Sequence, residues 1–189
     1  MGKYTKIPAD SFEKLQLNAG ILLKKFDPKT ATVEESDMLG ATSGGLGFEA
    51  VPTYSDFGED IDNCPKNMKE LKRIESWEVK LSGSFVTIDT GSAKTVIGAA
   101  DIAPDDPTKV VPRNELKDSD FADLWLVGDY GAGEGYVAIH MINALSTGGF
   151  KMQTTDKAKG AFEFEFTGHY SMAKQTEVPF EVYIKKGDE

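Results

Sequence analysis

Alternation of apolar and polar residues is the dominant pattern along this chain, and the segment AFEFEFTGHYS shows it most clearly. Phe162, Phe164 and Phe166 alternate there with Glu163 and Glu165. Because successive side chains of a β-strand point to opposite faces, the pattern predicts a strand with three rings against a core. The same strand shows two carboxylates on its other face.

A similar pattern predicts a strand over the segment SWEVKLSGSFVTID. Apolar residues alternate from Trp77 to Leu81, and the apolar phase then shifts after Gly83 to Val86 and Ile88. An extra residue in a strand produces such a shift, so we expect a β-bulge near Gly83.

Two further segments, FADLWLVGDYG and GYVAIHMINAL, are apolar on both faces and are joined by the hairpin signal GAGEG. Such a strand is central in a sheet, or packs one of its faces against a partner. The last segment, VPFEVYIKK, places Phe180, Val182 and Ile184 on one face. Other expected strands cover residues 16–27, with a bend or bulge at Gly20, residues 46–54, with Pro52 near an edge or an end, and residues 148–155.

The segment TGSAKTVIGAAD breaks the alternation and predicts a short helix. Thr90 or Ser92 caps it, Val96 and Ile97 form its apolar side, and Gly98 ends it. The predicted fold class is therefore mostly β: an antiparallel β-sandwich or flattened barrel with one flanking α-helix and long loops.

Length and loops define the domain organisation. The 189 residues suit a single domain, residues 1–189. Long polar excursions are expected at residues 28–50, 55–72 and 101–120, with a helical turn near residues 67–72. Long ordered loops in small domains are usually functional.

Charge and cysteine content limit the classes of protein to which the chain can belong. The formal net charge is −10, from 31 acidic and 21 basic residues. This balance argues against a protein that grips nucleic acid, because gripping needs clustered Lys and Arg. Cys64 is the only cysteine, so no internal disulfide can form.

No motif in the sequence indicates catalysis or a bound cofactor. His140 and His169 are the only histidines, and they lack the spacing of a zinc site. The acidic run DFGEDIDN lacks the ligand order of an EF-hand loop, so a solvated loop is preferred over a calcium site. The glycine-rich GDYGAGEG opens a strand rather than a helix, unlike a phosphate loop. We therefore expect no catalytic, cofactor-binding or metal-binding residues, and no enzyme.

The chain resembles the major tail proteins, or tail tube proteins, of long-tailed, non-contractile bacteriophages. The resemblance covers most of the chain. It rests on LNAGILLKKFDP, on the strand WEVKLSGSFVTID with the helix SAKTVIGAAD after it, and on the block from DLWLVGDYG to GHYS. It is a likeness of sequence and strand order, without a catalytic motif.

This resemblance implies a structural, virion-tail protein without cofactors, assembled in the cytoplasm of a bacterial host. Subunits of that family form stacked, generally hexameric rings around the channel for DNA ejection. The implied partners are other copies of the chain, a tape-measure protein, tail terminator and distal tail proteins, and passing double-stranded DNA without specific binding. No membrane partner is implied. Arms or loops at residues 1–15, 28–50, 55–72 and 101–120 become candidates for contacts between rings, and shortening 55–72 should impair polymerisation.

The resemblance also suggests roles for particular side chains. Glu163, Glu165 and Glu78 are predicted to face the channel, where carboxylates repel DNA phosphates, unless they lie on the outer surface. Lys80 shares their expected face and is an exception that pairing with a glutamate would explain. The two strands with apolar faces become candidates for the subunit interface, through Leu124, Leu126, Ile139 and Met141.

Two alternatives remain open. The first is a tube subunit of a related particle: a tailocin, a gene-transfer particle or a secretion-system tube. The second is a monomeric β-sandwich that binds carbohydrate or calcium, with Trp77 and Trp125 as stacking platforms.

Overall fold

The computed structural model describes residues 4, 6–131 and 134–187. The described chain contains ten strands, one α-helix and three short 3₁₀ helices, joined by loops. In order they are η1 (Phe12–Lys14), β1 (Gln16–Leu23), η2 (Glu35–Asp37), β2 (Thr42–Asp56), β3 (Lys72–Phe85), α1 (Thr90–Ile97), β4 (Ala100–Ala103), β5 (Asp106–Pro112), η3 (Asp118–Asp120), β6 (Ala122–Tyr130), β7 (Tyr136–Ser146), β8 (Lys151–Gln153), β9 (Ala161–Gly168) and β10 (Phe180–Lys185).

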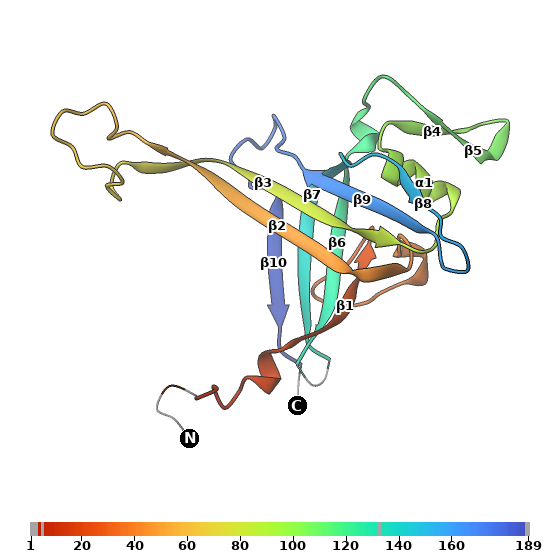
Figure 1. Ribbon diagram of the computed structural model, residues 1–189, viewed down its shortest axis with the longest axis horizontal. Coiled ribbons are helices and arrows are strands. Elements are labelled where there is room, and N and C mark those ends of the chain that lie inside the picture. The colour runs from red at the N-terminus through yellow and green to blue at the C-terminus, as the bar shows by residue number, and fades with distance from the viewer. Residues whose placement is uncertain (1–3, 5, 132–133, 188–189) are drawn as a thin grey trace.

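Eight strands form one antiparallel sheet that folds into two crossing layers (Figure 1). The path is β1-β6-β7-β9-β3-β2, with β10 paired to β7 and β8 paired to β9. Strand β7 belongs to both layers, because residues 136–141 pair with β10 while residues 144–146 pair with β9. We call β1, β6, β7 and β10 the back layer, and β2, β3 and β9 the front layer. The predicted class, an antiparallel β-sandwich with one flanking helix, is confirmed.

The main core lies between the two layers. Phe164 and Phe166 of β9 enter it, as their alternation with glutamate predicts, and both are at most 3% exposed. The buried members of this cluster are Leu22, Leu39, Val79, Leu81, Phe85, Val96, Leu124, Met141, Ala144, Phe164 and Phe166. Val96 comes from α1, so the helix closes one end of the sandwich.

A second core covers the opposite face of the back layer. Trp125 and Tyr136 lie there against Phe26, which comes from the segment after β1. The Tyr136 hydroxyl donates a hydrogen bond to the carbonyl oxygen of Pro28 and ties that segment down. The apolar character of both faces of β6 and β7 is therefore largely explained within one chain.

Helix α1 begins with a capping box. Asp89 is the N-cap, and its carboxylate accepts hydrogen bonds from both the backbone N–H and the hydroxyl of Ser92. These bonds lower the pKa of Asp89. The helix ends at Gly98, with φ at 83°, as predicted, whereas the N-cap is Asp89 rather than the expected Thr90 or Ser92.

The bulge expected near Gly83 lies instead on the neighbouring strand. Thr42 pairs with Phe85 and Leu46 with Gly83, so the extra residues belong to β2, where Gly44 and Gly45 have positive φ. Strand β3 keeps its phase to Phe85, which is fully buried. The expected shift to Val86 and Ile88 was wrong, since β3 ends before them.

The expected loops differ in what they form. Residues 101–120 contain the β4–β5 hairpin and η3, because Arg113 ties them together through Asp101 and Asp120. The segment 28–50 partly packs on the body through Leu39 and also holds the first part of β2, so it is not one free loop. Residues 67 and 69–71 lie in turns and Lys72 begins β3, so the helical turn expected there is not formed. Within the candidate arm 1–15, residues 1–3 and 5 lie outside the described residues.

Candidate interaction surfaces

The three glutamates predicted to act together do share one face, the outer face of the front layer. Glu163 and Glu165 on β9 pair with Ser84 and Ser82 of β3, and Glu78 lies farther along β3 on the same face. All three side chains point away from the core that the phenylalanines of β9 enter. The structure thus assembles the predicted acidic surface from two strands far apart in sequence.

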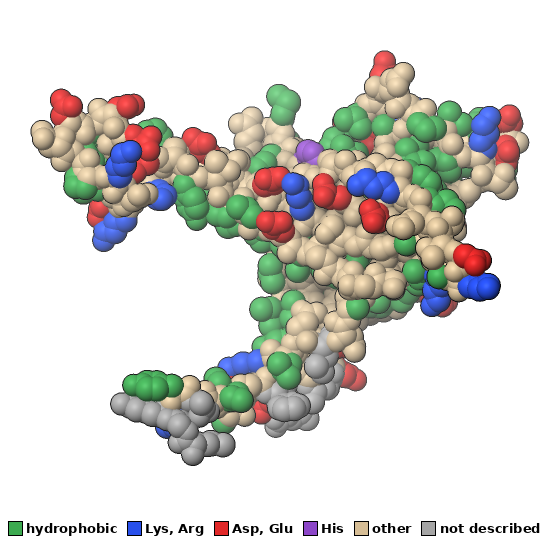
Figure 2. All heavy atoms as spheres, in the orientation of Figure 1, with side chains coloured by type: hydrophobic (Ala, Val, Ile, Leu, Met, Phe, Trp, Pro, Cys, Tyr) green, Lys and Arg blue, Asp and Glu red, His purple; other side chains and the backbone are tan. Residues whose placement is uncertain are grey.

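Two lysines on this surface offset part of its negative charge. The Lys80 ammonium lies 2.6 Å from a carboxylate oxygen of Glu78, which explains the lysine on this face. That hydrogen bond raises the pKa of Lys80. Glu49 pairs with Lys80 across β2 and β3, and Lys151 pairs with Glu163 across β8 and β9. The surface therefore carries four glutamates, Glu49, Glu78, Glu163 and Glu165, and two lysines, Lys80 and Lys151. Figure 2 shows this mixture of acidic and basic side chains.

A shallow polar hollow of about 400 Å³ lies beside Glu163 and Glu165. Its walls are mostly glycine and serine, from the bulged start of β2 and from β3. A methyl group built on Gly44 or Gly45 would meet no atom within 4 Å, so neither glycine is required by packing. Positive φ at both positions supplies the reason for glycine.

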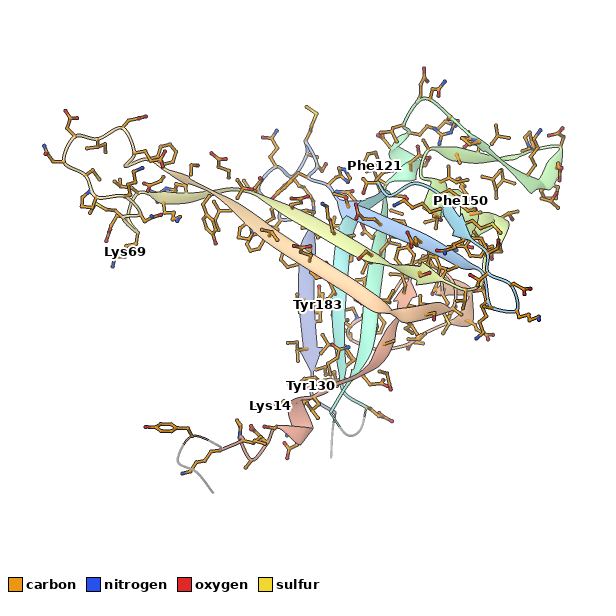
Figure 3. All side chains as sticks on the ribbon, viewed as in Figure 1. Lys14, Lys69, Phe121, Tyr130, Phe150 and Tyr183 are labelled. Atoms are coloured by element: carbon orange, nitrogen blue, oxygen red, sulfur yellow. The ribbon has the colours of Figure 1, made fainter. Side chains whose placement is uncertain are left out.

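Strands β2 and β3 continue past the body as an arm, which we define as residues 53–76. Figure 1 shows the arm projecting sideways from the two crossing layers, and Figure 3 labels Lys69 at its tip. The expected excursion 55–72 is therefore the tip of a long hairpin. Its exposed apolar side chains were not predicted; they are Tyr54 (53%), Phe57 (64%), Ile61 (52%), Met68 (40%) and Ile74 (51%).

The arm leaves the body with its apolar face towards the same side as the core. Strand β2 alternates without a break from Phe48 to Tyr54, so Tyr54 shares the face that packs on the core at Phe48. Ile74 is the cross-strand partner of Tyr54 and lies on the same face. The register shift here comes from one extra residue, Glu75 on β3, whose carboxylate accepts a hydrogen bond from Ser55. We call Tyr54 and Ile74 the arm patch.

At the base of the arm, a latch fixes its direction. The backbone N–H of Trp77 donates a 2.9 Å hydrogen bond to the Tyr170 hydroxyl, from the loop before β10. The Trp77 ring also packs edge-on against Phe180 of β10, with 5.5 Å between centroids.

The back layer carries a matching exposed area, because the front layer covers only part of it. Val182 and Ile184 continue the face of Phe180 along β10 but are 51% and 64% exposed. Their partners on β7, Ile139 and Val137, lie beside them and are half-buried. We call the uncovered area of Leu126, Val137, Ile139, Val182 and Ile184 the open face.

The four predicted interface residues divide between the covered and uncovered parts of this face. Leu124 and Met141 are 2% and 1% exposed in the main core of their own chain. Their burial corrects the expectation that they face another subunit. Leu126 and Ile139 are half-buried at the open face. Alternation reveals which residues share a face, but not how far the covering layer reaches along it.

Both histidines have partners within the chain. The His140 ring stacks on Trp125 with 4.0 Å between centroids, and its two nitrogens lie 3.2 Å from Asp123 and 3.3 Å from Glu181. The Tyr183 hydroxyl and His140 lower the pKa of Glu181. His169 lies 3.3 Å from the Asn143 carbonyl oxygen.

The acidic run 56–63 is organised by backbone hydrogen bonds. Asp56 accepts hydrogen bonds from the N–H groups of Gly58 and Asn67, which lower its pKa. Among the described residues, no three His, Cys, Asp or Glu side chains meet in an arrangement that could hold a metal ion. Within that same part of the chain, no helix has the length and apolar character needed to cross a membrane.

Comparisons with known proteins leave the family open. No model of a protein family matches the sequence, and no curated protein matches it either. A solved chain described as "Virion of native gene transfer agent (GTA) particle" aligns with 81% of this chain and 92% of its own length, at a TM-score of 0.44 and 7% identity. A likeness at that level carries no argument about what this chain does.

Proposed function

We propose that this chain is a structural subunit of a virion or virion-like particle, and specifically of a tail tube built from stacked, hexameric rings. One observation carries the proposal: the chain has two complete cores and still exposes an apolar arm patch and an apolar open face. A monomeric protein rarely leaves contiguous apolar surface on a long projecting hairpin. The sequence resemblance to tail tube proteins supplies the kind of assembly.

The acidic surface fits this role as a channel lining. DNA phosphates bind to lysine-rich surfaces, whereas carboxylates repel them over about 8–10 Å at physiological salt. We propose that Glu163, Glu165 and Glu78 face the channel, with Lys80 neutralised by its ion pair. In a density map of the assembled tube, Glu163 and Glu165 on the exterior would overturn this assignment.

The carbohydrate-binding alternative loses its main support. Trp125 is 8% exposed and stacked on His140, and Trp77 is half-buried against Phe180. The Trp125 indole is therefore not available as a sugar platform, and part of Trp77 is taken up by its contact with Phe180. A tube subunit of a tailocin, gene-transfer particle or secretion system shares the proposed assembly and differs only in the particle around it.

Assembly of the purified chain tests the proposal. The protein is concentrated stepwise, its mass is followed by light scattering, and the products are imaged by negative-stain electron microscopy. We expect rings or tubes with a central channel. A protein that stays at its 20.6 kDa monomer mass at every concentration and ionic strength would overturn the proposal.

A further inference from the structure

We infer that the arm of one copy docks on the open face of a second copy, so that the two surfaces form one head-to-tail contact. This inference rests on the proposed self-assembly and names the surfaces that carry it. Three features of the structure lead to it: the direction of the two faces, their lack of charge, and their separation within one chain.

The direction of the faces is the first feature. The front layer packs its inner face on the back layer, and the arm patch continues that inner face past the body. The open face continues the face of the back layer that receives it, from Phe180 to Val182 and Ile184. An arm laid on the open face of a second copy would extend the sandwich packing that already exists within each chain.

Charge is the second feature. The open face consists of Leu126, Val137, Ile139, Val182 and Ile184, without an ionisable side chain among them. The arm patch is equally apolar, with the Lys72 ammonium 5.3 Å from the centre of the Tyr54 ring at its margin. Burial of either surface against a charged partner would desolvate that charge without compensation, whereas burial of the two surfaces against each other brings only the Lys72 ammonium near the contact, at its margin.

Separation is the third feature. Figure 1 shows the arm running away from the lower end of the back layer, where β10 ends. Figure 2 shows apolar side chains along the lower edge of the arm, and others on the part of the body that lies below the arm in this view. The hydrogen bond from Trp77 to Tyr170 fixes the base of the arm on the body, and the paired strands β2 and β3 continue from there in a direction away from the open face of the same chain. The two surfaces therefore meet only between copies.

A contact between two different surfaces of identical chains is heterologous, and it repeats until it closes into a ring or grows as a filament. Each copy then gives one arm and receives one. This arrangement differs from a two-fold dimer, in which the same patch meets itself. The difference makes the contact testable by mixing two defective variants.

The arm variant carries Tyr54→Lys and Ile74→Glu, which places opposite charges on one cross-strand pair and so preserves the hairpin. The face variant carries Val182→Lys and Ile184→Glu, so that at a contact between Ile74 and Ile184 its charges repel those of the arm variant. Both variants keep the parent's net charge. The matched control carries Met152→Glu and Met172→Lys, at side chains that are 58% and 90% exposed outside both surfaces. Circular dichroism and thermal melts verify that all of them fold.

We expect the control to assemble like the parent and each variant alone to remain monomeric. A one-to-one mixture of the variants should form a heterodimer of twice the 20.6 kDa chain mass and grow no further, because one intact arm meets one intact face. As a second readout, Ile74→Cys in one copy and Ile184→Cys in another, both with Cys64→Ser, should form an intermolecular disulfide on oxidation.

The outcomes separate this contact from the proposed function. If the parent assembles and both variants assemble equally well, the contact is wrong and the tube proposal stands. If both variants are monomeric but their mixture gives no heterodimer, the pairing of these two surfaces is wrong. If the parent never leaves the monomer, both the tube proposal and the contact fail.

Discussion

Replacement of Phe85 with alanine tests the register of the front layer, on which every surface described above depends. Phe85 is the last residue of β3 and is fully buried. Its ring centroid lies 4.3 Å from that of Phe164, and its Cδ1 atom is 3.1 Å from the position that a Cβ on Gly40 would occupy. The ring therefore fills a closely packed site with little room for neighbours to collapse.

Removal of a fully buried phenylalanine ring costs about 3–5 kcal/mol of unfolding free energy, because apolar contact is lost and a cavity remains. For a chain of this length, each kcal/mol lowers the melting temperature by about 2–4 °C. We therefore expect Phe85→Ala to melt roughly 10 °C below the parent. In urea, the midpoint should fall without a change in the slope of the transition, since the exposed surface on unfolding is nearly the same.

Val86→Ala is the matched control, because the sequence pattern alone places the core position at residue 86. The structure makes Val86 only half-buried and beyond the end of β3, so its truncation should cost about 1 kcal/mol or less. Both variants are compared by urea titration with tryptophan fluorescence. A larger loss for Val86→Ala than for Phe85→Ala would show that the strand does slip by one residue and that the described register is incorrect.

Three further substitutions test local features. Asp89→Ala removes the N-cap of α1 and should lower stability by about 1 kcal/mol at neutral pH. Hydrogen bonds to Ser92 hold the pKa of Asp89 below its ordinary 3.8, so this contribution is present above that pH and is lost as the pH falls through the folded pKa. The gap between variant and parent should therefore close in acid; a gap that persists would assign it to packing. Lys80→Ala breaks an exposed ion pair, and its melting temperature should match that of the parent at 0.15 M salt; a clear drop would contradict the view that this pair is only a surface contact. Arg113→Ala leaves the Asp120 carboxylate, whose side chain is 0% exposed, with the backbone N–H of Lys117 as its one hydrogen-bond donor among the described residues. The expected cost is about 1–3 kcal/mol by urea titration, and an unchanged midpoint would refute a stabilising role for the arginine.

Strand positions could be predicted because alternation follows directly from the geometry of a half-buried strand. The phenylalanines of β9 and the shared face of Glu163, Glu165 and Glu78 were obtained in this way. Helix α1 was predicted from its local signals, the polar cap and Gly98. The β4–β5 hairpin was missed because prolines and charges in that segment indicate a loop, while an ion-pair network around Arg113 holds the paired strands.

The extent to which the front layer covers the back layer could not be predicted, because it depends on the angle between the two layers. Leu124 and Leu126 share a face of β6 in any reading of the sequence, yet only Leu124 lies fully beneath the front layer. The same is true of Met141 and Ile139 on β7. No local pattern records where one layer stops covering another, so the subunit-interface prediction mixed core residues with exposed ones.

The crossing of the layers links the arm and the open face. Two sheets that cross at a large angle overlap only near the crossing point, and each extends beyond the other. In this chain the extension of the front layer is the arm, and the uncovered extension of the back layer is the open face. Both apolar extensions arise from the crossing of the layers. Neither is covered within its own chain, because each lies beyond the end of the opposite layer. A second copy supplies the missing layer for each of them, with the same inner-face packing that already fills the main core. Because the two extensions are different surfaces, each copy gives one arm and receives one, and the contact repeats from copy to copy until it closes into a ring or grows as a filament.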